Sequence, residues 1–401
     1  MTAVAVRRCP ALHRYLIGQL ISVTCSWTQV VALSWVVVNR DPAAVGWVVG
    51  LQFAPSLLLG PWFGTLVDRH DRKRILMLCE AGLGLIALGY AVAVSNEARL
   101  LWIFVLAALW GVTNALDTPA RQAMVPALVA PARRARASAM TGIVVLLGMA
   151  AGSALGTALV VGTGPTTAFI VNAASFLFDI GLLSTIRVTT STPVRRAPRQ
   201  LRDGLDYVLR APQVRNPLLG LAVLGTFAFT VQVSVPILVK QAFTGGSTLV
   251  GAGFTAVTVG GLSGAVIAAI RGTPGPRSLG RAAWVMAASM TVTALAPTVP
   301  IVLTGLAGVG LAWSLFVVST IAILQTADGA MLGRVMSWLA VVLVGGTAAG
   351  GPLAGALAAF VGPRAPFLLG AAAALVAGVV AAPRRRRSPV AQPHCQAVMP
   401  Q

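Results

Sequence analysis

Charged residues are scarce in this sequence, and acids are the scarcest of them. Asp, Glu, Lys and Arg together make up 10% of the 401 residues, whereas a soluble domain carries roughly 25%. Ten acids stand against 30 basic residues, and 57% of the chain is hydrophobic. So little polar side-chain material cannot cover a large surface in contact with water. The composition therefore predicts an integral membrane protein rather than a soluble one.

Cysteine and histidine are also rare, which argues against metal and disulfide chemistry. The four cysteines have no CxxC spacing and the three histidines are scattered: Cys9, Cys25, Cys79, Cys395, His13, His70 and His394. The chain also lacks an HExxH motif, a Walker loop and paired acids of a membrane-embedded enzyme. We therefore expect neither an enzyme nor a resident metal or cofactor.

Long apolar runs recur along the whole chain. A helix needs about 20 apolar residues to cross the roughly 30 Å of a bilayer's hydrocarbon core. Twelve segments meet that requirement, near 15–38, 44–67, 75–95, 100–117, 138–161, 166–186, 217–239, 248–270, 280–297, 299–322, 335–360 and 365–382. We predict an all-α integral membrane fold of twelve transmembrane helices in two pseudo-symmetric six-helix halves. The first apolar segment has no convincing cleavage site and is predicted to remain as the first helix.

The basic residues test this count through the positive-inside rule. With a cytoplasmic N-terminus, all but four of the 30 basic residues fall in inside loops. The four exceptions are Arg40, Arg99, Lys240 and Arg364. A wrong helix count would scramble this asymmetry, so we expect a multi-pass protein of the bacterial plasma (inner) membrane with both termini cytoplasmic. Basic residues placed between apolar runs, rather than on one folded face, also argue against a nucleic-acid partner.

The chain divides into four regions. Residues 1–186 form the expected N-terminal half and 216–383 the C-terminal half. Between them, the hydrophilic stretch 187–215 contains Leu201, Leu205, Val208 and Leu209 at helical spacing. This pattern fits a short amphipathic helix on the cytoplasmic surface, and a solvated linker fits equally well. Residues 384–401 are expected to form a disordered basic tail that meets anionic lipid headgroups.

The expected loop between the second and third helices carries a distinctive motif. We call it the gate motif: Gly64, Asp68, Arg69, Arg72, Lys73 and Arg74. The glycine permits close helix approach, Asp68 can accept from N–H groups at the start of the next helix, and the basic side chains can pair across the two halves. Purely topogenic charges are the alternative. The motif resembles the cytoplasmic signature of the major facilitator superfamily, from which Asp71 departs because a glycine is frequent there.

A second motif lies at the end of the fourth expected helix. Its residues are Asn114, Asp117, Pro119, Arg121 and Gln122. The stretch resembles the drug:proton antiporter branch that includes the enterobactin (siderophore) exporter group. Other stretches agree with that branch, among them Ser26–Gln29, Leu51–Pro55, Asn172–Phe176 and Gly333–Ser337. The resemblance implies efflux driven by the proton motive force, as in drug resistance, by a monomer in the bilayer with the proton as coupling ion.

Small residues recur at helical spacing in the fifth and eleventh expected helices. They are Gly148, Gly152 and Gly156 in the first half, and Gly351, Pro352 and Gly355 in the second. Such stripes let helix backbones approach closely and slide, and they indicate an internal duplication. They resemble the superfamily's antiporter motif, although Ser153 stands at its usual proline and Met149 where this branch commonly has a buried arginine. Both departures count against proton coupling.

Two acids lie inside predicted helices, Asp179 and Glu80, and no intramembrane Lys or Arg is expected near either. A buried carboxyl without a cation tends to bind a proton. We therefore predict Asp179 as the leading proton carrier, with a structural, Ser- or Asn-bonded acid as the alternative. Glu80, about 9 Å along its helix from Arg74, is the second candidate and is expected to snorkel to the inner interface.

In the superfamily, the first, fourth, seventh and tenth helices line the central cavity. The resemblance therefore implies six substrate-cavity candidates, Trp27, Gln29, Asn114, Gln232, Trp313 and Ser319, although each is an ordinary packing residue under the alternative. The leading hypothesis is a secondary active transporter that exports a small amphiphile (drug, siderophore or secondary metabolite) by proton-coupled alternating access. An importer or facilitator on the same fold, and a non-transporting membrane partner, remain as alternatives.

Overall fold

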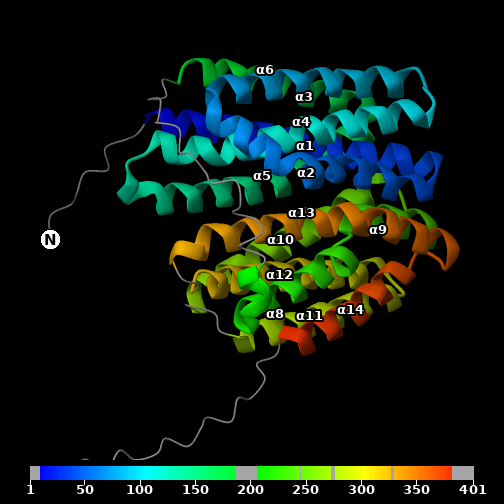
Figure 1. The fold of residues 1–401 in the computed structure, drawn as a ribbon. Helices are drawn as coiled ribbons and strands as arrows, with labels where there is room; N and C mark the ends of the chain where they lie inside the picture. The colour runs from blue at the N-terminus through cyan, green and yellow to red at the C-terminus, as the bar shows by residue number, and fades with distance from the viewer. Residues whose placement is uncertain (1–9, 187–205, 244, 272–275, 327–328, 382–401) are drawn as a thin grey trace, which may run out of the picture.

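The computed structural model describes residues 10–186, 206–243, 245–271, 276–326 and 329–381. The tail 384–401 and most of the linker 187–215 lie outside these residues. Within them every regular element is a helix, which confirms the all-helical fold expected from the sequence. Figure 1 shows two stacked groups of helices, with the N-terminal half above the C-terminal half.

The N-terminal half contains six long helices joined by short connections. They are α1 (Pro10–Arg40), α2 (Pro42–Arg69), α3 (Arg72–Ser95), α4 (Leu100–Leu128), α5 (Arg134–Gly162) and α6 (Pro165–Ser184), with a 3₁₀ turn η1 (Pro131–Arg133) before α5. Side chains set two of the boundaries. Asp41 accepts from the Ala43 N–H at 2.9 Å to cap α2, and Asp71 accepts from the Lys73 and Arg74 N–H groups to cap α3.

The C-terminal half repeats this plan. Its elements are α8 (Pro212–Val223), the π-helical turn η2 (Leu224–Ala228), α9 (Val231–Ala242), α10 (Ser247–Arg271), α11 (Pro276–Leu295), α12 (Val299–Leu324), α13 (Gly329–Phe360) and α14 (Ala365–Ala381). The short stretch 206–210 before α8 is also helical. There Val208 is buried in the core of the C-terminal half, whereas Leu209 is exposed.

Most of these helices are long and apolar enough to cross a membrane. Ten spans of the described residues qualify by length and hydropathy, with α8, η2 and α9 counted together as Pro212–Ala242. The N-terminal half holds six of these spans and the C-terminal half four, and the less apolar α11 and the shorter α14 bring the C-terminal half to six. Large apolar side chains on the outer faces, such as Trp62, Leu78 and Phe360, are exposed, as lipid contact requires.

The seventh span is broken near its middle, where the sequence predicts one continuous helix over 217–239. The α8 helix widens into the π turn η2, after which Phe229 and Thr230 leave helical geometry and α9 begins. The Phe229 N–H reaches back five residues to the Leu224 carbonyl at 2.8 Å. Broken helices are tolerated inside membranes where their backbone is covered by protein or lines a cavity.

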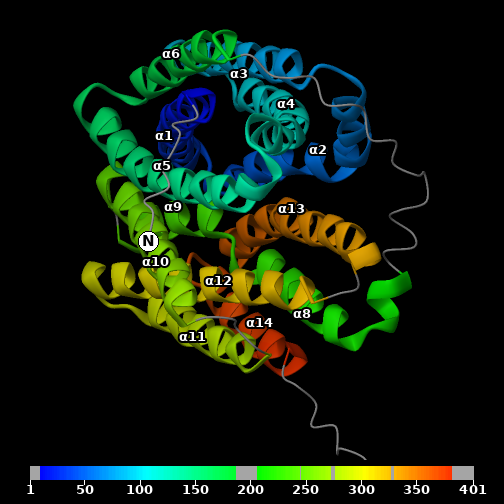
Figure 2. The ribbon, with the colours of Figure 1, turned by 90° about the vertical axis from the view of Figure 1, so that its left-hand side faces the viewer.

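The two halves touch mainly along two helix pairs, α2 with α13 and α5 with α10, and α1 also contacts α9 and α10. In Figure 2, which looks along the bundle, α5 lies beside α10 and α2 beside α13. Both contacts gather toward the end that holds the α1–α2 connection at Asp41, which we call the distal end. The opposite end, with the α2–α3 connection at His70 and Asp71, is called the basic end.

Glycines decide where the halves approach. On Gly46, near the start of α2, a Cβ would lie 2.5 Å from the carbonyl oxygen of Gly351, and on Gly251 of α10 it would collide with Thr157 of α5. Lys240 also crosses between the halves at the distal end, 5.5 Å from the centre of the Trp35 ring. Toward the basic end, by contrast, a Cβ on Gly64 or Gly333 would meet no atom of the described residues within 4 Å. The contacts recorded between the halves through these residues therefore lie toward the distal end.

Candidate functional site: a central cavity and a buried charge cluster

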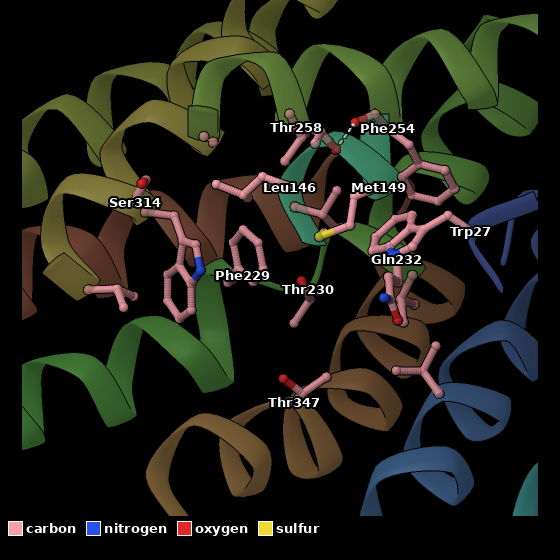
Figure 3. A pocket seen from close by; sticks show the side chains of 18 of the residues that line it. Trp27, Leu146, Met149, Phe229, Thr230, Gln232, Phe254, Thr258, Ser314 and Thr347 are labelled. Atoms are coloured by element: carbon pink, nitrogen blue, oxygen red, sulfur yellow. Dashed lines mark hydrogen bonds between the residues drawn. The ribbon is translucent and has the colours of Figure 1, made fainter. Parts of the chain in front are cut away.

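A cavity of about 390 Å³ lies between the two halves. Its wall is drawn from α1, α2, α5, the broken span, α10, α12 and α13 (Figure 3). This volume falls in the range of about 300–1,000 Å³ that is typical of small-molecule sites. The wall is mainly apolar and contains five aromatic residues: Trp27, Phe53, Phe229, Phe254 and Trp313.

The break in the seventh span puts backbone and side chains directly into the cavity wall. Phe229 and Thr230, the two non-helical residues, line it together with Gln232 at the start of α9. Glycines of α13 make room for the break, because a Cβ on Gly350 would collide with the Thr226 carbonyl and lie 3.0 Å from the Thr230 methyl. The α13 glycines thus allow a kinked helix to face the cavity.

The structure divides the six cavity candidates in two. Trp27, Gln232 and Trp313 line the cavity. The other three do not. The buried Gln29 accepts from the Asn172 amide at 2.9 Å, Ser319 accepts from Ser278 at 2.9 Å, and Asn114 lies half-buried on α4, outside the wall.

Sequence reasoning missed several wall residues. Phe229, Thr230, Thr258, Ser314 and Thr347 line the cavity, and so does Met149, which was considered only for its place in a motif. A signal for the first two was present, because Gly225 and Pro236 flank them within one apolar run and such interruptions indicate discontinuous membrane helices. The others depend on how α10, α12 and α13 are rotated, which only tertiary packing determines.

A second polar centre lies inside the N-terminal half, where Arg121 of α4 meets three carboxyl groups. It donates through Nε to Asp117 at 2.7 Å and forms an ion pair with Glu80 of α3. Its Nη2 atom is also 3.5 Å from a carboxylate oxygen of Asp179 on α6. All three acids are buried, and Glu80 is 0% exposed. We call Glu80, Asp117, Arg121 and Asp179 the charge cluster.

The first helix closes the charge cluster from the side. Tyr15 donates its hydroxyl to the Arg121 carbonyl oxygen at 3.3 Å. Gly18 lies directly against Asp179, so a Cβ at this position would collide with the carboxylate. Only one carboxylate oxygen of Asp117 accepts from Arg121, and its other oxygen, Oδ1, accepts no hydrogen bond from the described residues. Four helices of one half thus surround a centre that holds three acids and one cation.

This arrangement corrects three expectations. The prediction that no intramembrane Lys or Arg neutralises Asp179 or Glu80 was wrong, because Arg121 pairs with both. Arg121 was assigned to an inside loop, but α4 continues to Leu128 and buries it. Glu80 was expected to snorkel to the interface, and instead its side chain is enclosed.

The charge cluster and the cavity are separate sites joined by α1. No member of the cluster lines the cavity. Gly18, which backs Asp179, and Trp27, in the cavity wall, are nine residues apart on α1, or about 14 Å at 1.5 Å per residue. The α1 helix therefore contacts both sites, and a shift of this helix would change both.

Close to Trp27 along the chain, α1 is held against α6 by the buried amide pair of Gln29 and Asn172. Asn172 donates to Gln29 at 2.9 Å, Ser26 donates to Asn172 at 3.5 Å, and Ser175 donates to the Asn172 carbonyl at 2.7 Å. Buried polar groups that satisfy one another fix the alignment of two helices. The stretches Ser26–Gln29 and Asn172–Phe176, which resemble the family, therefore hold α1 against α6.

The gate motif makes its observed contacts within its own half. Lys73 donates to the carbonyls of Ser184 and Ile186, both at 2.8 Å, and so caps the end of α6. Arg72 lies 3.5 Å from the Ala123 carbonyl of α4. The cap of α3 is Asp71 rather than Asp68, whose side chain is not among the described groups. In this conformation, the recorded partners of Arg72, Lys73 and Arg74 all lie in the N-terminal half.

The predicted small-residue stripes pack in different ways. Gly148, Gly152 and Gly156 of α5 face α1, where a Cβ would press on Val23, Thr24 or Thr28. In contrast, Gly351 and Gly355 of α13 face Gly46 of the other half, and Pro352 lies over Gly50. Of the fourth-helix motif, Pro119 sits inside α4 and Gln122 is exposed. The second-half stripe is therefore part of the contact between the halves.

Two six-helix halves around a central cavity define a multi-pass membrane transporter of the major facilitator type. The chain belongs to the transmembrane secretion effector family (MFS_3), whose family model matches residues 2–397. The relatives and solved structures that it resembles are named as transporters or exporters.

Curated relatives include siderophore transporters. The staphyloferrin A transporter of Staphylococcus aureus (strain NCTC 8325 / PS 47) is 25% identical over 244 residues, which cover 59% of this chain and 61% of that protein. The enterobactin exporter EntS of Escherichia coli O9:H4 (strain HS) is 28% identical over 353 residues, which cover 83% and 82%. Several matches, including the first, span less than two thirds of the relative's length; that to EntS of Shigella boydii serotype 4 (strain Sb227) covers 48%.

Solved structures share the fold at low identity. A bacterial homologue of the human lysosomal transporter Spinster, inward-facing and occupied, superposes with a TM-score of 0.71 at 15% identity, over 93% of this chain and 96% of that one. A bacterial homologue of the iron transporter ferroportin in the inward-facing state gives 0.70 at 17% identity, over 93% and 98%.

Proposed function

We propose that this protein exports a small molecule across the bacterial plasma membrane in exchange for protons, by alternating access. The observation that carries the proposal is the buried charge cluster, in which three carboxyl groups share one guanidinium. If all were ionised, the cluster would hold two uncompensated negative charges away from water, which is costly. Protons that bind and leave these carboxyls would supply the coupling.

The alternating-access part rests on the asymmetry between the two ends. The contacts recorded between the halves through Gly46, Gly351 and Gly251 lie toward the distal end. With the basic residues of the loops on the cytoplasmic side, as the positive-inside rule places them, this conformation faces inward. Rocking about the cavity would close the basic end and open the distal end.

The direction of transport is drawn from the relatives. EntS is named an enterobactin exporter, and its sequence aligns with 83% of this chain. The central cavity would receive a cytoplasmic compound when the halves separate at the basic end. The proton would bind at the charge cluster, and Asp179 is the leading carrier because it faces α1, the helix that also reaches the cavity.

Everted membrane vesicles test this proposal with three radiolabelled probes of one ring system. The probes are 2-naphthamide (neutral), 2-naphthalenesulfonate (anionic) and 2-naphthylmethyl-trimethylammonium (cationic). We expect at least one probe to accumulate in a gradient-dependent way, absent from vesicles without the protein and abolished by a protonophore. Accumulation only in right-side-out vesicles would identify an importer and overturn the export proposal, as would uptake that ignores the gradient.

A further inference from the structure

The cavity wall contains no ionisable side chain among the residues that line it. Its polar members among the described residues are Thr230, Gln232, Thr258, Ser314 and Thr347, all neutral, and the remainder are aliphatic or aromatic residues, Met or Gly. A charged group brought into such an environment without a counter-charge loses its hydration. An anion gains no partner there, and a cation gains at most an aromatic face, whose attraction is smaller than the cost of burying the charge. The wall therefore disfavours ligands with a net charge at the bound end.

The charged side chains that lie near α1 on either side of Trp27 are too distant to compensate a charge on the ligand. The charge cluster meets α1 at Gly18, about 14 Å below Trp27 along the helix. On the other side, Lys240 lies over Trp35, two helical turns or about 12 Å beyond Trp27. The cation of Arg121 is moreover engaged with its own acids.

Most of the polar groups in the wall are already hydrogen-bonded within the protein. Thr230 is 3.0 Å from the Ser234 hydroxyl, Thr258 donates to the Phe254 carbonyl at 2.9 Å, and Thr347 donates to the Leu343 carbonyl at 3.3 Å. Gln232 and Ser314 make no hydrogen bond that the structure records among the described residues. Gln232, labelled in Figure 3, can both donate and accept, so it suits a neutral polar group such as an amide.

The aromatic side chains set the shape of the ligand. Phe229 and Trp313 are stacked, with ring centres 4.1 Å apart and planes at 7°. Trp27 meets Phe254 edge to face at 6.2 Å. Figure 3 shows Phe229 and Trp27 in different parts of the cavity wall, with Met149 between them. Flat aromatic surfaces of this kind favour a flat, apolar ring system that can stack on them.

We propose that the substrate is an uncharged, flat aromatic compound with one neutral hydrogen-bonding group, which Gln232 recognises while the rings pack against the aromatic wall. This assignment rests on the proposed transport function and narrows it, because it excludes ligands that present a carboxylate or another fixed charge to the cavity. The assignment therefore distinguishes this cavity from a cavity that binds anionic chelators.

Binding to the purified full-length protein in lipid nanodiscs tests the assignment, by calorimetry with the three naphthalene probes. We expect 2-naphthamide to bind at least about tenfold more tightly than the sulfonate or the ammonium compound. Equal or tighter binding of a charged probe would overturn the assignment even if gradient-driven export were observed. Conversely, the protein could bind the amide preferentially and export no probe. That result would support the assignment of the substrate and contradict the transport proposal.

Two variants and one control locate the preference in the cavity. Gln232→Leu should weaken 2-naphthamide binding by about threefold to tenfold, the value of one neutral hydrogen bond. Thr304→Val, an exposed position of α12 outside the cavity wall whose hydroxyl donates to the Pro300 carbonyl, should change it by less than about twofold. Met149→Arg should raise affinity for the sulfonate by about tenfold, because it adds a cation to the wall. No gain for the sulfonate in a folded Met149→Arg protein, or equal losses in Gln232→Leu and Thr304→Val, would contradict the assignment.

Discussion

Gly46 of α2 lies against Gly351 of α13, so that the two halves touch through bare backbone at the distal end of the bundle. A side chain at Gly46 would have to occupy the position of the Gly351 carbonyl, 2.5 Å from an added Cβ. Gly351 also lines the cavity. One glycine contact thus closes the distal end directly above the cavity.

A bulky residue at this contact should hold the distal end open. We expect Gly46→Leu to speed the reaction of a cysteine placed at Thr347, in a background without native cysteines, with a membrane-impermeant maleimide applied from the distal side. Gly60→Leu, on the same helix but with no described atom within 4 Å of its Cβ position, is the matched control. Equal labelling of the two variants would show that the glycine contact does not close this end.

The charge cluster makes a prediction about stability. Arg121→Gln leaves three buried carboxyls without their cation, and breaking a buried ion pair on one side costs about 3–5 kcal/mol. We expect a large fall in the thermal unfolding midpoint in detergent, greater at pH 8 than at pH 5, because protons can replace the missing positive charge only at low pH. Arg74→Gln is the control, since Arg74 is 86% exposed and lies 3.7 Å from Asp71. If Arg121→Gln unfolded at pH 8 at the same temperature as Arg74→Gln, the claim that Arg121 stabilises the buried carboxyls would be contradicted.

The amide pair between α1 and α6 should show strong coupling. Either Asn172→Leu or Gln29→Leu leaves one buried amide without its partner, at a cost of about 1–3 kcal/mol. The double variant removes both groups and should be more stable than the sum of the single losses predicts. Thermal unfolding of the four proteins measures this cycle. Strict additivity would mean that the two side chains do not depend on one another.

The spans and the overall fold could be predicted because they depend on local composition. Apolar runs of the required length and the gathering of arginines between them identify the helices, and the gate motif places the chain in its superfamily. Arg121 shows the limit of that reasoning. A loop assignment fits its charge, yet α4 continues past it and three acids from α3, α4 and α6 surround it. Such a pairing depends on how separate helices pack, which hydropathy does not record.

The cavity shows a similar division. Trp27, Gln232 and Trp313 could be predicted because they lie on helices that line the cavity in the superfamily, whereas Gln29 and Ser319 lie on the same helices but face neighbouring helices instead. Helix rotation decides between these positions. The break at Phe229 and Thr230 was hidden in a continuous apolar run, because Gly225 and Pro236 permit a kink without requiring one.

Coupling between the proton and the substrate is the central claim, and Asp179→Asn tests it most directly. The substitution leaves Arg121 paired with Glu80 and Asp117, so the half should still fold. In proteoliposomes, we would compare exchange of whichever naphthalene probe the protein carries with its accumulation driven by a pH gradient. We predict that the variant keeps exchange near the wild-type rate and loses gradient-driven accumulation, whereas Asp71→Asn keeps both. Gradient-driven accumulation at the wild-type rate in Asp179→Asn would contradict the proposal that this carboxyl carries the proton.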